Sequence, residues 1–258
     1  MTDLYLGTSG YSYKDWEGIF YPENIKSSDY LVFYGKYFNS VEINFSYYAV
    51  PNPYLFSALS AKVDNDFLFS VKAHSSMTHQ RNANEKIYSD FLKALEPLAI
   101  SNKMGPVLFQ FPYSFHFSVE NLSYLLKLRK IFKDFDAVFE FRNSQWVRDE
   151  VFYFLKENNA GFANVDEPSL SGLMPGSDYL TNDTFYLRFH GRNSEKWWNH
   201  EKAYERYDYM YSEPELNSWV PKIKKAVLSA KKSFIYFNNH YKAKAVSSAN
   251  ILLKLIKT

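Results

Sequence analysis

The sequence predicts an α/β fold, a TIM-like (β/α)8 barrel with aromatic-rich loops after its strands. Strand-like and helix-like patterns alternate from end to end of the 258 residues, and about 250 residues is the usual length of such a barrel. No linker or low-complexity stretch divides the chain, so we expect residues 1–258 to form one domain. A doubly wound open sheet is the alternative, but the glycines that usually follow its first strand are missing.

Eight segments rich in β-branched and aromatic residues predict the strands. In chain order they are residues 4–8, 40–46, 67–73, 106–112, 135–142, 160–166, 184–190 and 233–239. Apolar residues at helical spacing predict helices between them, at 30–38, 55–59, 85–102, 119–132, 147–155, 215–231 and 249–256. The helix at 215–231 tolerates Pro221 near its start, where a missing N–H costs little. Residues 168–183 and 191–214 are predicted loops.

Composition excludes several classes of chemistry. The chain has no cysteine, which excludes disulfides, Cys-ligated zinc, iron–sulfur clusters and thiol catalysis. It has only 9 glycines and neither of the common glycine-rich phosphate-binding motifs. No apolar run is long enough to cross a membrane, and Met1–Leu4 do not resemble a signal peptide. We therefore expect a cytoplasmic protein that does not interact with membranes.

Charge is uneven along the chain. Residues 216–258 contain nine lysines and no aspartate, glutamate or arginine. Such a segment could contact the phosphates of a nucleic acid. The simpler interpretation is a pair of surface helices with lysine-rich solvent faces.

The predicted strands carry polar residues on one face, toward their C-terminal ends. Successive strand residues point to opposite sides, and the other face is apolar, as in Phe67, Phe69 and Val71. In a barrel the polar face points inward and ends at the C-terminal mouth, where barrel enzymes have their active sites. The polar residues are Glu42, Asn44, Ser70, Lys72, Gln110, Glu140, Arg142, Asn164, Asp166, Arg188, His190, Asn238 and His240.

These residue types indicate an anionic substrate. Guanidinium groups bind phosphate or carboxylate, so Arg142, Arg188, Arg192 and Lys72 are candidates for holding it. The candidate catalytic groups are Glu140, Glu42, Asp166 and His190, because carboxylates and imidazoles serve as general bases and acids. Further candidates for substrate binding are Gln110, Asn44 and Asn238.

No cofactor is required by the sequence. Of the six histidines only His190 and His240 fall at strand ends, so we predict no dedicated metal site. A divalent cation on the carboxylates remains open as an alternative.

Aromatic residues follow several strands. Tyr11 and Trp16 come after the first strand, and Tyr204 and Tyr207 after the seventh. Aromatic rings interleaved with basic residues can stack on bases or sugars. Alternatively, the long loops form small apolar cores of their own, which aromatic rings fill well.

The whole chain resembles the YecE-like family, a domain of unknown function (number 72). The matching motifs are Gly7-Thr8-Ser9-Gly10-Tyr11 with Trp16 and Phe20-Tyr21-Pro22, Val41-Glu42-Ile43-Asn44, Phe69-Ser70-Val71-Lys72-Ala73 with Thr78-His79, Gln110-Phe111-Pro112, Phe139-Glu140-Phe141-Arg142-Asn143 with Trp146, Leu187-Arg188-Phe189-His190-Gly191-Arg192 and Phe237-Asn238-Asn239. The chain departs from the family pattern after Asn239, where Ala243 replaces a glycine and Ser248-Ala249 an Asn-Ala pair. The resemblance implies a TIM-like barrel without an established activity. The family's architecture is similar to endonuclease-IV-like and xylose-isomerase-like barrels, which implies nucleic-acid or sugar chemistry by analogy of fold.

Three functional hypotheses follow. The first is an enzyme acting on a phosphate-bearing substrate, as a hydrolase or lyase of phosphodiesters in nucleic acid. The second is an enzyme acting on a sugar or sugar phosphate. The third is a non-catalytic protein that binds an anionic small molecule or nucleic acid.

Overall fold

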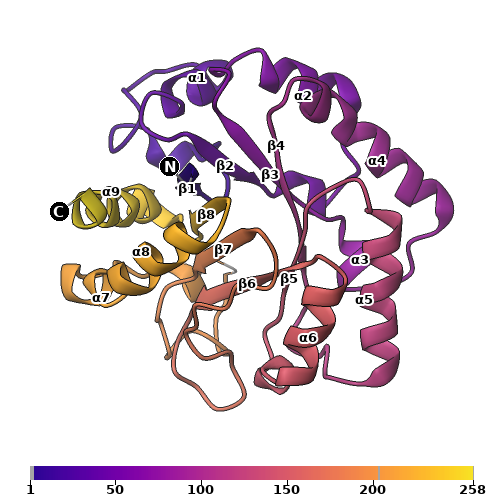
Figure 1. The fold of residues 1–258 in the computed structure, drawn as a ribbon. Helices are drawn as coiled ribbons and strands as arrows, with labels where there is room; N and C mark the ends of the chain where they lie inside the picture. The colour runs from indigo at the N-terminus through magenta and orange to yellow at the C-terminus, as the bar shows by residue number, and fades with distance from the viewer. Residues whose placement is uncertain (1–2, 203, 258) are drawn as a thin grey trace.

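Eight parallel strands form the centre of the structure, a computed structural model that describes residues 3–202 and 204–257 (Figure 1). Around the sheet the strands follow the order β1-β8-β7-β6-β5-β4-β3-β2. They are β1 (Asp3–Thr8), β2 (Ser40–Ile43), β3 (Leu68–Lys72), β4 (Met104–Gln110), β5 (Ala137–Glu140), β6 (Gly161–Asp166), β7 (Thr184–Phe189) and β8 (Lys232–Phe237). The pairing of β1 with β8 brings the first and last strands together, which makes the sheet a TIM-like barrel.

Helices cover the outside of the strands (Figure 1). They are α1 (Tyr30–Tyr34), α2 (Pro53–Ser60), α3 (Ser75–Thr78), α4 (Glu85–Ile100), α5 (Val119–Ile131), α6 (Asp149–Glu157), α7 (Glu213–Asn217), α8 (Val220–Ser229) and α9 (Lys244–Lys257). Side-chain caps set several starts: Asn84 accepts from the N–H of Ile87, and Ser118 from that of Asn121. No helix in the described part of the chain is long and apolar enough to cross a bilayer. The expectation that the chain has no signal peptide rests partly on Met1 and Thr2, which lie outside the described residues.

One predicted helix is wrong. The segment 215–231 forms two helices, α7 and α8, that meet at Ser218 and Trp219. Pro221 has no N–H to donate to the carbonyl four residues before it, so it stands in the first turn of a new helix instead of inside a longer one. The predicted loop between β6 and β7 is confirmed, since residues 167–183 contain no helix.

The seam between β1 and β2 closes the barrel with side chains as well as backbone. The two strands share a single bridge, between Ser9 and Glu42. Further down, the N–H of Thr8 donates to the Tyr34 hydroxyl at 2.8 Å, and that hydroxyl donates to the carbonyl of Ser40. Gly7 is needed here, since a Cβ at this position would lie 1.9 Å from the Ser40 carbonyl oxygen.

The barrel interior changes from apolar to ionic toward the mouth. The lower part is packed with Leu68, Leu108, Val138 and Phe234. Above them the hydroxyl of Tyr236 bonds to the hydroxyls of Ser40 and Ser70. The next level holds charged side chains that are completely buried, and the cavity of the candidate site lies on top of them.

Candidate functional site

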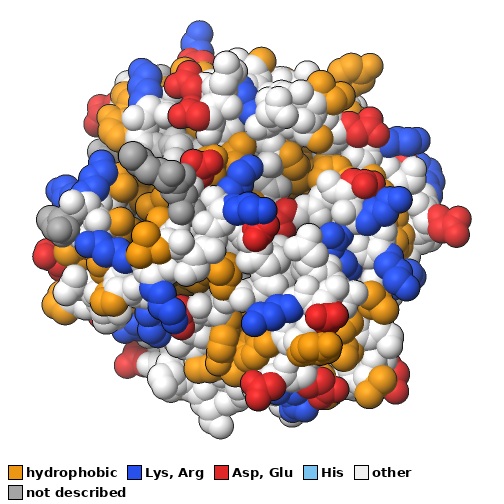
Figure 2. Space-filling view, in the orientation of Figure 1, with side chains coloured by type: hydrophobic (Ala, Val, Ile, Leu, Met, Phe, Trp, Pro, Cys, Tyr) orange, Lys and Arg blue, Asp and Glu red, His pale blue; other side chains and the backbone are white. Residues whose placement is uncertain are grey.

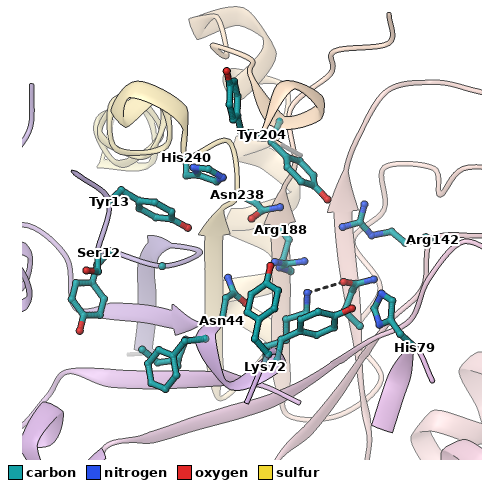
Figure 3. Close-up of a pocket in the computed structure, with 18 residues that line it drawn as sticks. Ser12, Tyr13, Asn44, Lys72, His79, Arg142, Arg188, Tyr204, Asn238 and His240 are labelled. Atoms are coloured by element: carbon teal, nitrogen blue, oxygen red, sulfur yellow. Dashed lines mark hydrogen bonds between the residues drawn. The ribbon is translucent and has the colours of Figure 1, made fainter. Parts of the chain in front are cut away.

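A cavity of about 650 Å³ opens at the C-terminal mouth of the barrel (Figure 3). This volume lies within the range of small-molecule sites. Every strand but β6 contributes to its lining through its last residues or the loop that follows. The lining residues are Gly10, Tyr11, Ser12, Tyr13, Ile43, Asn44, Phe45, Tyr47, Tyr48, Lys72, His79, Gln110, Arg142, Arg188, Tyr204, Tyr207, Asn238 and His240.

Arg188, from β7, lies at the centre of the cavity floor and is held by two buried carboxylates. Its Nε and Nη2 donate to both oxygens of Glu42, at 2.8 and 2.7 Å, and its Nη1 donates to Glu140 at 2.6 Å. Burial alone would raise the pKa of Glu140, but attraction to Arg188 and Arg142 outweighs it and holds that pKa well below its ordinary value. Glu140 is therefore an ionised partner of both arginines.

Arg142, just after β5, is held in a similar way. Its Nε donates to Glu140 at 2.6 Å and its Nη1 to Glu167 at 3.1 Å. Burial raises the pKa of Glu167 to about 7, against the opposing attraction of Arg142. His190 lies against the same groups, with its Nε2 3.3 Å from Glu140, and burial together with Arg142 lowers its pKa, so it is neutral.

Lys72, the last residue of β3, is bound differently from the two arginines. Its Nζ donates to Oε1 of Gln110 at 2.8 Å and lies 4.6 Å from the centre of the Tyr47 ring (Figure 3). Among the described residues no carboxylate comes within ion-pair distance of it. Burial, followed by repulsion from Arg188, lowers the pKa of Lys72 to about 8.

Two buried polar atoms of the cavity wall have no hydrogen-bond partner in the described part of the chain. They are Oδ1 of Asn44 and Nδ1 of His240. His240 is stacked on Tyr13 with ring centres 4.5 Å apart, and burial lowers its pKa, so it is neutral. These two atoms can therefore form hydrogen bonds with a molecule that enters the cavity.

Aromatic rings form the rest of the wall. Figure 3 shows Tyr13 and His240 on one side of the cavity and Arg142 and His79 on the other, with Lys72 and Arg188 between them. Burial, followed by repulsion from Lys72, lowers the pKa of His79 to about 4, so it too is neutral at pH 7. The site thus combines cationic groups with flat apolar surfaces.

Most of the predicted substrate-binding residues line the cavity. They are Lys72, Gln110, Arg142, Arg188, Asn44, Asn238, Tyr11, Tyr204 and Tyr207. Three of the predicted catalytic residues, Glu42, Glu140 and His190, lie beneath the floor with no exposed surface. None of the three reaches the cavity. Glu42 and Glu140 are bound to the arginines instead, because a buried guanidinium group requires a carboxylate partner.

The prediction that Asn164 and Asp166 of β6 point into the barrel is wrong. Ala163 pairs with Tyr186 and faces the barrel interior, so Asn164 and Asp166 face outward. Asn164 accepts from Ser177 in the loop that covers this side of β6. Phe152 of α6 packs on Phe162 at this outer face, and the loop covers the rest of it and supplies the polar partner of Asn164.

Three further predicted site residues do not line the cavity: Asp166, Arg192 and Trp16. Asp166 binds both Nε and Nη2 of Arg192 and the indole N–H of Trp219. Arg192 follows the left-handed turn at Gly191, which directs it away from the mouth. Trp16 is completely buried and donates to the carbonyl of His240, so it supports the wall from behind.

Sequence reasoning missed Glu167. This residue directly follows Asp166 and has the inward phase, which a correct phase for β6 would have revealed. Tyr13 and Tyr47 belong to the aromatic residues that follow the first and second strands, and His79 belongs to the Thr78-His79 motif of the family resemblance; all three line the cavity from segments beyond the strand ends, where the two-residue period no longer applies. No group of three or more histidine, aspartate or glutamate side chains suited to a metal ion occurs within residues 3–202 and 204–257.

The nine lysines of residues 216–258 are exposed or half-buried. Lys225 pairs with Asp178 at 2.8 Å and Lys231 with Asp183 at 2.5 Å, and Lys244 also pairs with Asp208. On the face drawn in Figure 2, basic and acidic side chains are interspersed. Acidic residues from elsewhere in the chain thus neutralise part of the charge of this region.

Comparisons with known proteins agree with this architecture. The sequence model of a protein family described as "Protein of unknown function DUF72" matches residues 5–258. The UPF0759 protein YunF of Bacillus subtilis (strain 168) is 30% identical over 269 residues, which cover 98% of this chain and 94% of that protein. A crystal structure of a DUF72 family protein from Thermotoga maritima has a TM-score of 0.91 at 37% identity and covers 99% of this chain and 100% of its own. One from Enterococcus faecalis has a TM-score of 0.88 at 27% identity, covering 99% and 96%.

Proposed function

The chain belongs to the DUF72 family of proteins of unknown function, and we propose that it is an enzyme acting on a small, hydroxylated, phosphate-bearing substrate of the sugar-phosphate class. The substrate would occupy the cavity at the mouth of the barrel. Its phosphate would lie toward Arg142 and Arg188, and its hydroxyl groups toward Asn44 and His240. This proposal keeps the cytoplasmic location expected from the sequence.

The observation that carries the proposal is the combination, in one cavity, of a cationic floor with polar atoms that have no hydrogen-bond partner among the described residues. Oδ1 of Asn44 can only accept a hydrogen bond, so it requires a donor such as a hydroxyl group. Each guanidinium has five N–H groups. Arg188 uses four of them, three for Glu42 and Glu140 and one for Ser9, and keeps one on Nη1. Arg142 uses two for Glu140 and Glu167. The tyrosine walls supply surfaces on which a sugar ring packs.

The charge of the floor favours a small anion over nucleic acid. Three cations, Lys72, Arg142 and Arg188, are opposed by Glu42, Glu140 and the partly protonated Glu167. The surplus is at most about one positive charge, which suits a single phosphate group. Binding of nucleic acid usually draws on many uncompensated basic residues, and several lysines of the C-terminal region are paired with aspartates.

A catalytic role is supported by the perturbed pKa of Lys72, about 8. Strongly shifted groups in a cleft are typical of active sites, where an amine must lose its proton near neutral pH. A protein that only binds an anion has no need of such a shift, since a fully charged lysine would bind better.

The proposal is tested by thermal unfolding in the presence of ribose 5-phosphate, dihydroxyacetone phosphate, their dephosphorylated forms, and single- and double-stranded oligonucleotides. We expect the phosphorylated sugars to raise Tm and the other compounds not to, because a ligand that binds only the folded state stabilises it. We expect Lys72→Met to weaken binding at least about tenfold, the effect of losing roughly 1.4 kcal/mol of interaction.

Lys222→Met is the matched control. Lys222 also lies over an aromatic ring, 4.7 Å from the centre of Trp219, but outside the cavity. Its substitution is expected to leave binding unchanged. Stabilisation by oligonucleotides with a steep salt dependence, and none by sugar phosphates, would contradict the proposal and favour the nucleic-acid hypothesis.

A further inference from the structure

Lys72 differs from every other cation of the cavity floor in what surrounds its charge. Arg142 and Arg188 each bind two carboxylates. Lys72 is instead held by the amide oxygen of Gln110 and the face of the Tyr47 ring. A lysine that only neutralised the buried glutamates would be expected to contact one of them.

The groups facing Lys72 disfavour its protonated form on balance. Arg188 and Arg142 repel the ammonium group from β7 and from the end of β5, and burial removes it from water. Glu140 and Glu42 attract it, but both are already bound to the arginines. With a pKa of about 8, about one molecule in ten carries a neutral amine at pH 7, whereas an ordinary lysine is neutral in fewer than roughly one in a thousand.

We propose that Lys72 is a catalytic nucleophile that forms a Schiff base with a carbonyl group of the substrate. This inference rests on the proposed function for the phosphate that brings the substrate to the floor, and it adds that the substrate is an aldehyde or ketone. Desolvated lysines beside other cations are the recurrent solution for such chemistry in proteins.

The neighbours of Lys72 orient its amine and stabilise the cationic product. Nε2 of Gln110 donates to the carbonyl of Phe111 at 2.6 Å, which fixes the amide so that Oε1 faces Lys72 and orients its Nζ. The Tyr47 ring, 4.6 Å from Nζ, stabilises a cation and therefore also the iminium ion. Arg142 and Arg188 remain available for the phosphate.

The step is balanced without an oxidant or a reductant. The ammonium group of Lys72 first releases one proton to solvent. The lone pair of the neutral Nζ then forms a bond to the carbonyl carbon as the C=O π bond breaks, and one proton passes from this nitrogen to the oxygen, which gives a neutral carbinolamine. The hydroxyl group takes up a proton from solvent, equivalent to the one released, and leaves as water while the nitrogen lone pair forms the C=N bond. The ammonium form and a carbonyl compound thus give an iminium ion and one water, with one positive charge on each side.

Borohydride trapping tests the inference. The full-length protein is incubated with dihydroxyacetone phosphate, or with dihydroxyacetone, reduced with sodium borohydride, digested and mapped by mass spectrometry. We expect one adduct per chain, at Lys72, formed at least tenfold faster with the phosphorylated ketone and at least tenfold faster than any adduct at Lys222. Lys72→Arg keeps a cation but cannot form an imine, so it should lose the adduct while dihydroxyacetone phosphate still raises its Tm.

The outcomes separate this inference from the proposed function. If dihydroxyacetone phosphate raises the Tm of the wild-type protein but no adduct forms at Lys72, the Schiff base is wrong and phosphate binding stands. If both ketones label Lys72 equally and neither changes Tm, the Schiff base stands and the phosphate assignment is wrong. Labelling spread over surface lysines at equal rates would overturn the nucleophilic role, and mapping on the wild-type protein decides this even if Lys72→Arg does not fold.

Discussion

Glu42 and Glu140 show that a carboxylate that looks like a general base in the sequence can instead support other side chains of the site. Each has the type and strand position of a general base, yet both are fully buried and are bound to arginines. Ionising a carboxylate at this depth would be very costly without such partners. Glu42 fixes Arg188, and Glu140 fixes both Arg188 and Arg142, at the floor of the cavity.

Glu167 makes stability depend on pH. Burial raises its pKa to about 7 in the folded protein, above the ordinary value near 4.3 of the unfolded chain. The folded state therefore retains a proton that the unfolded state loses, and the stabilisation that this proton provides is complete below about pH 4 and is lost as the pH rises through 7. Glu167→Gln, which keeps an uncharged side chain at every pH, removes this dependence.

We expect Glu167→Gln to gain stability relative to the wild-type protein as the pH rises from 5 to 8, by up to about 3 kcal/mol. Urea unfolding of both proteins at pH 5, 6, 7 and 8 measures the difference. A constant difference across this range would show that Glu167 is ionised throughout.

At the scale of elements, the seam between β1 and β2 depends on one tyrosine. Tyr34 of α1 is completely buried, and its hydroxyl bonds to the backbone of both strands, at Thr8 and Ser40. Few backbone bonds join these strands directly, so the hydroxyl takes the place of a missing strand partner.

Tyr34→Phe leaves the N–H of Thr8 buried without an acceptor, which costs about 1–3 kcal/mol. We expect urea unfolding to show a loss of stability of that size. Tyr153→Phe is the control, since Tyr153 lies on α6 with 67% of its surface exposed, and it should change stability very little. Equal effects of the two substitutions would mean that a water molecule accepts the hydrogen bond from the N–H of Thr8 when the Tyr34 hydroxyl is absent.

The segment around β6 shows why the phase of a strand can mislead. All six of its residues are buried, so neither face has the exposure that usually separates inside from outside. Polar residues on the outer face, Asn164 and Asp166, are satisfied by distant segments, at Ser177 and Arg192. The pattern of a single strand cannot reveal such partners.

At the scale of the whole molecule, the barrel joins the two ends of the chain. β1 pairs with β8 along its full length, and α9 packs on both strands. An independently folding half would expose unpaired strand edges, so we predict that residues 1–258 unfold as one domain.

We expect tryptophan fluorescence and far-UV circular dichroism to give the same urea midpoint. The buried tryptophans are spread around the barrel, in the loops after β1, β5 and β7, at Trp16, Trp146, Trp197 and Trp219. Fluorescence therefore reports on both halves of the chain. Two separate midpoints would contradict the single domain.

The sequence alone determined the barrel, the mouth and the inward face of most strands, because hydrophobic alternation and strand–helix order depend only on local residues. It predicted Lys72, Arg142 and Arg188 at the mouth of the barrel, and all three line the cavity. Tertiary structure alone decided how deep each inward residue lies, which depends on how the strands are staggered around the barrel. That depth buried Glu140 beneath Arg188 and left Lys72 without a carboxylate partner. The candidate nucleophile could therefore be recognised only from the packed structure, since an amine's reactivity is set by neighbours far from it in the chain.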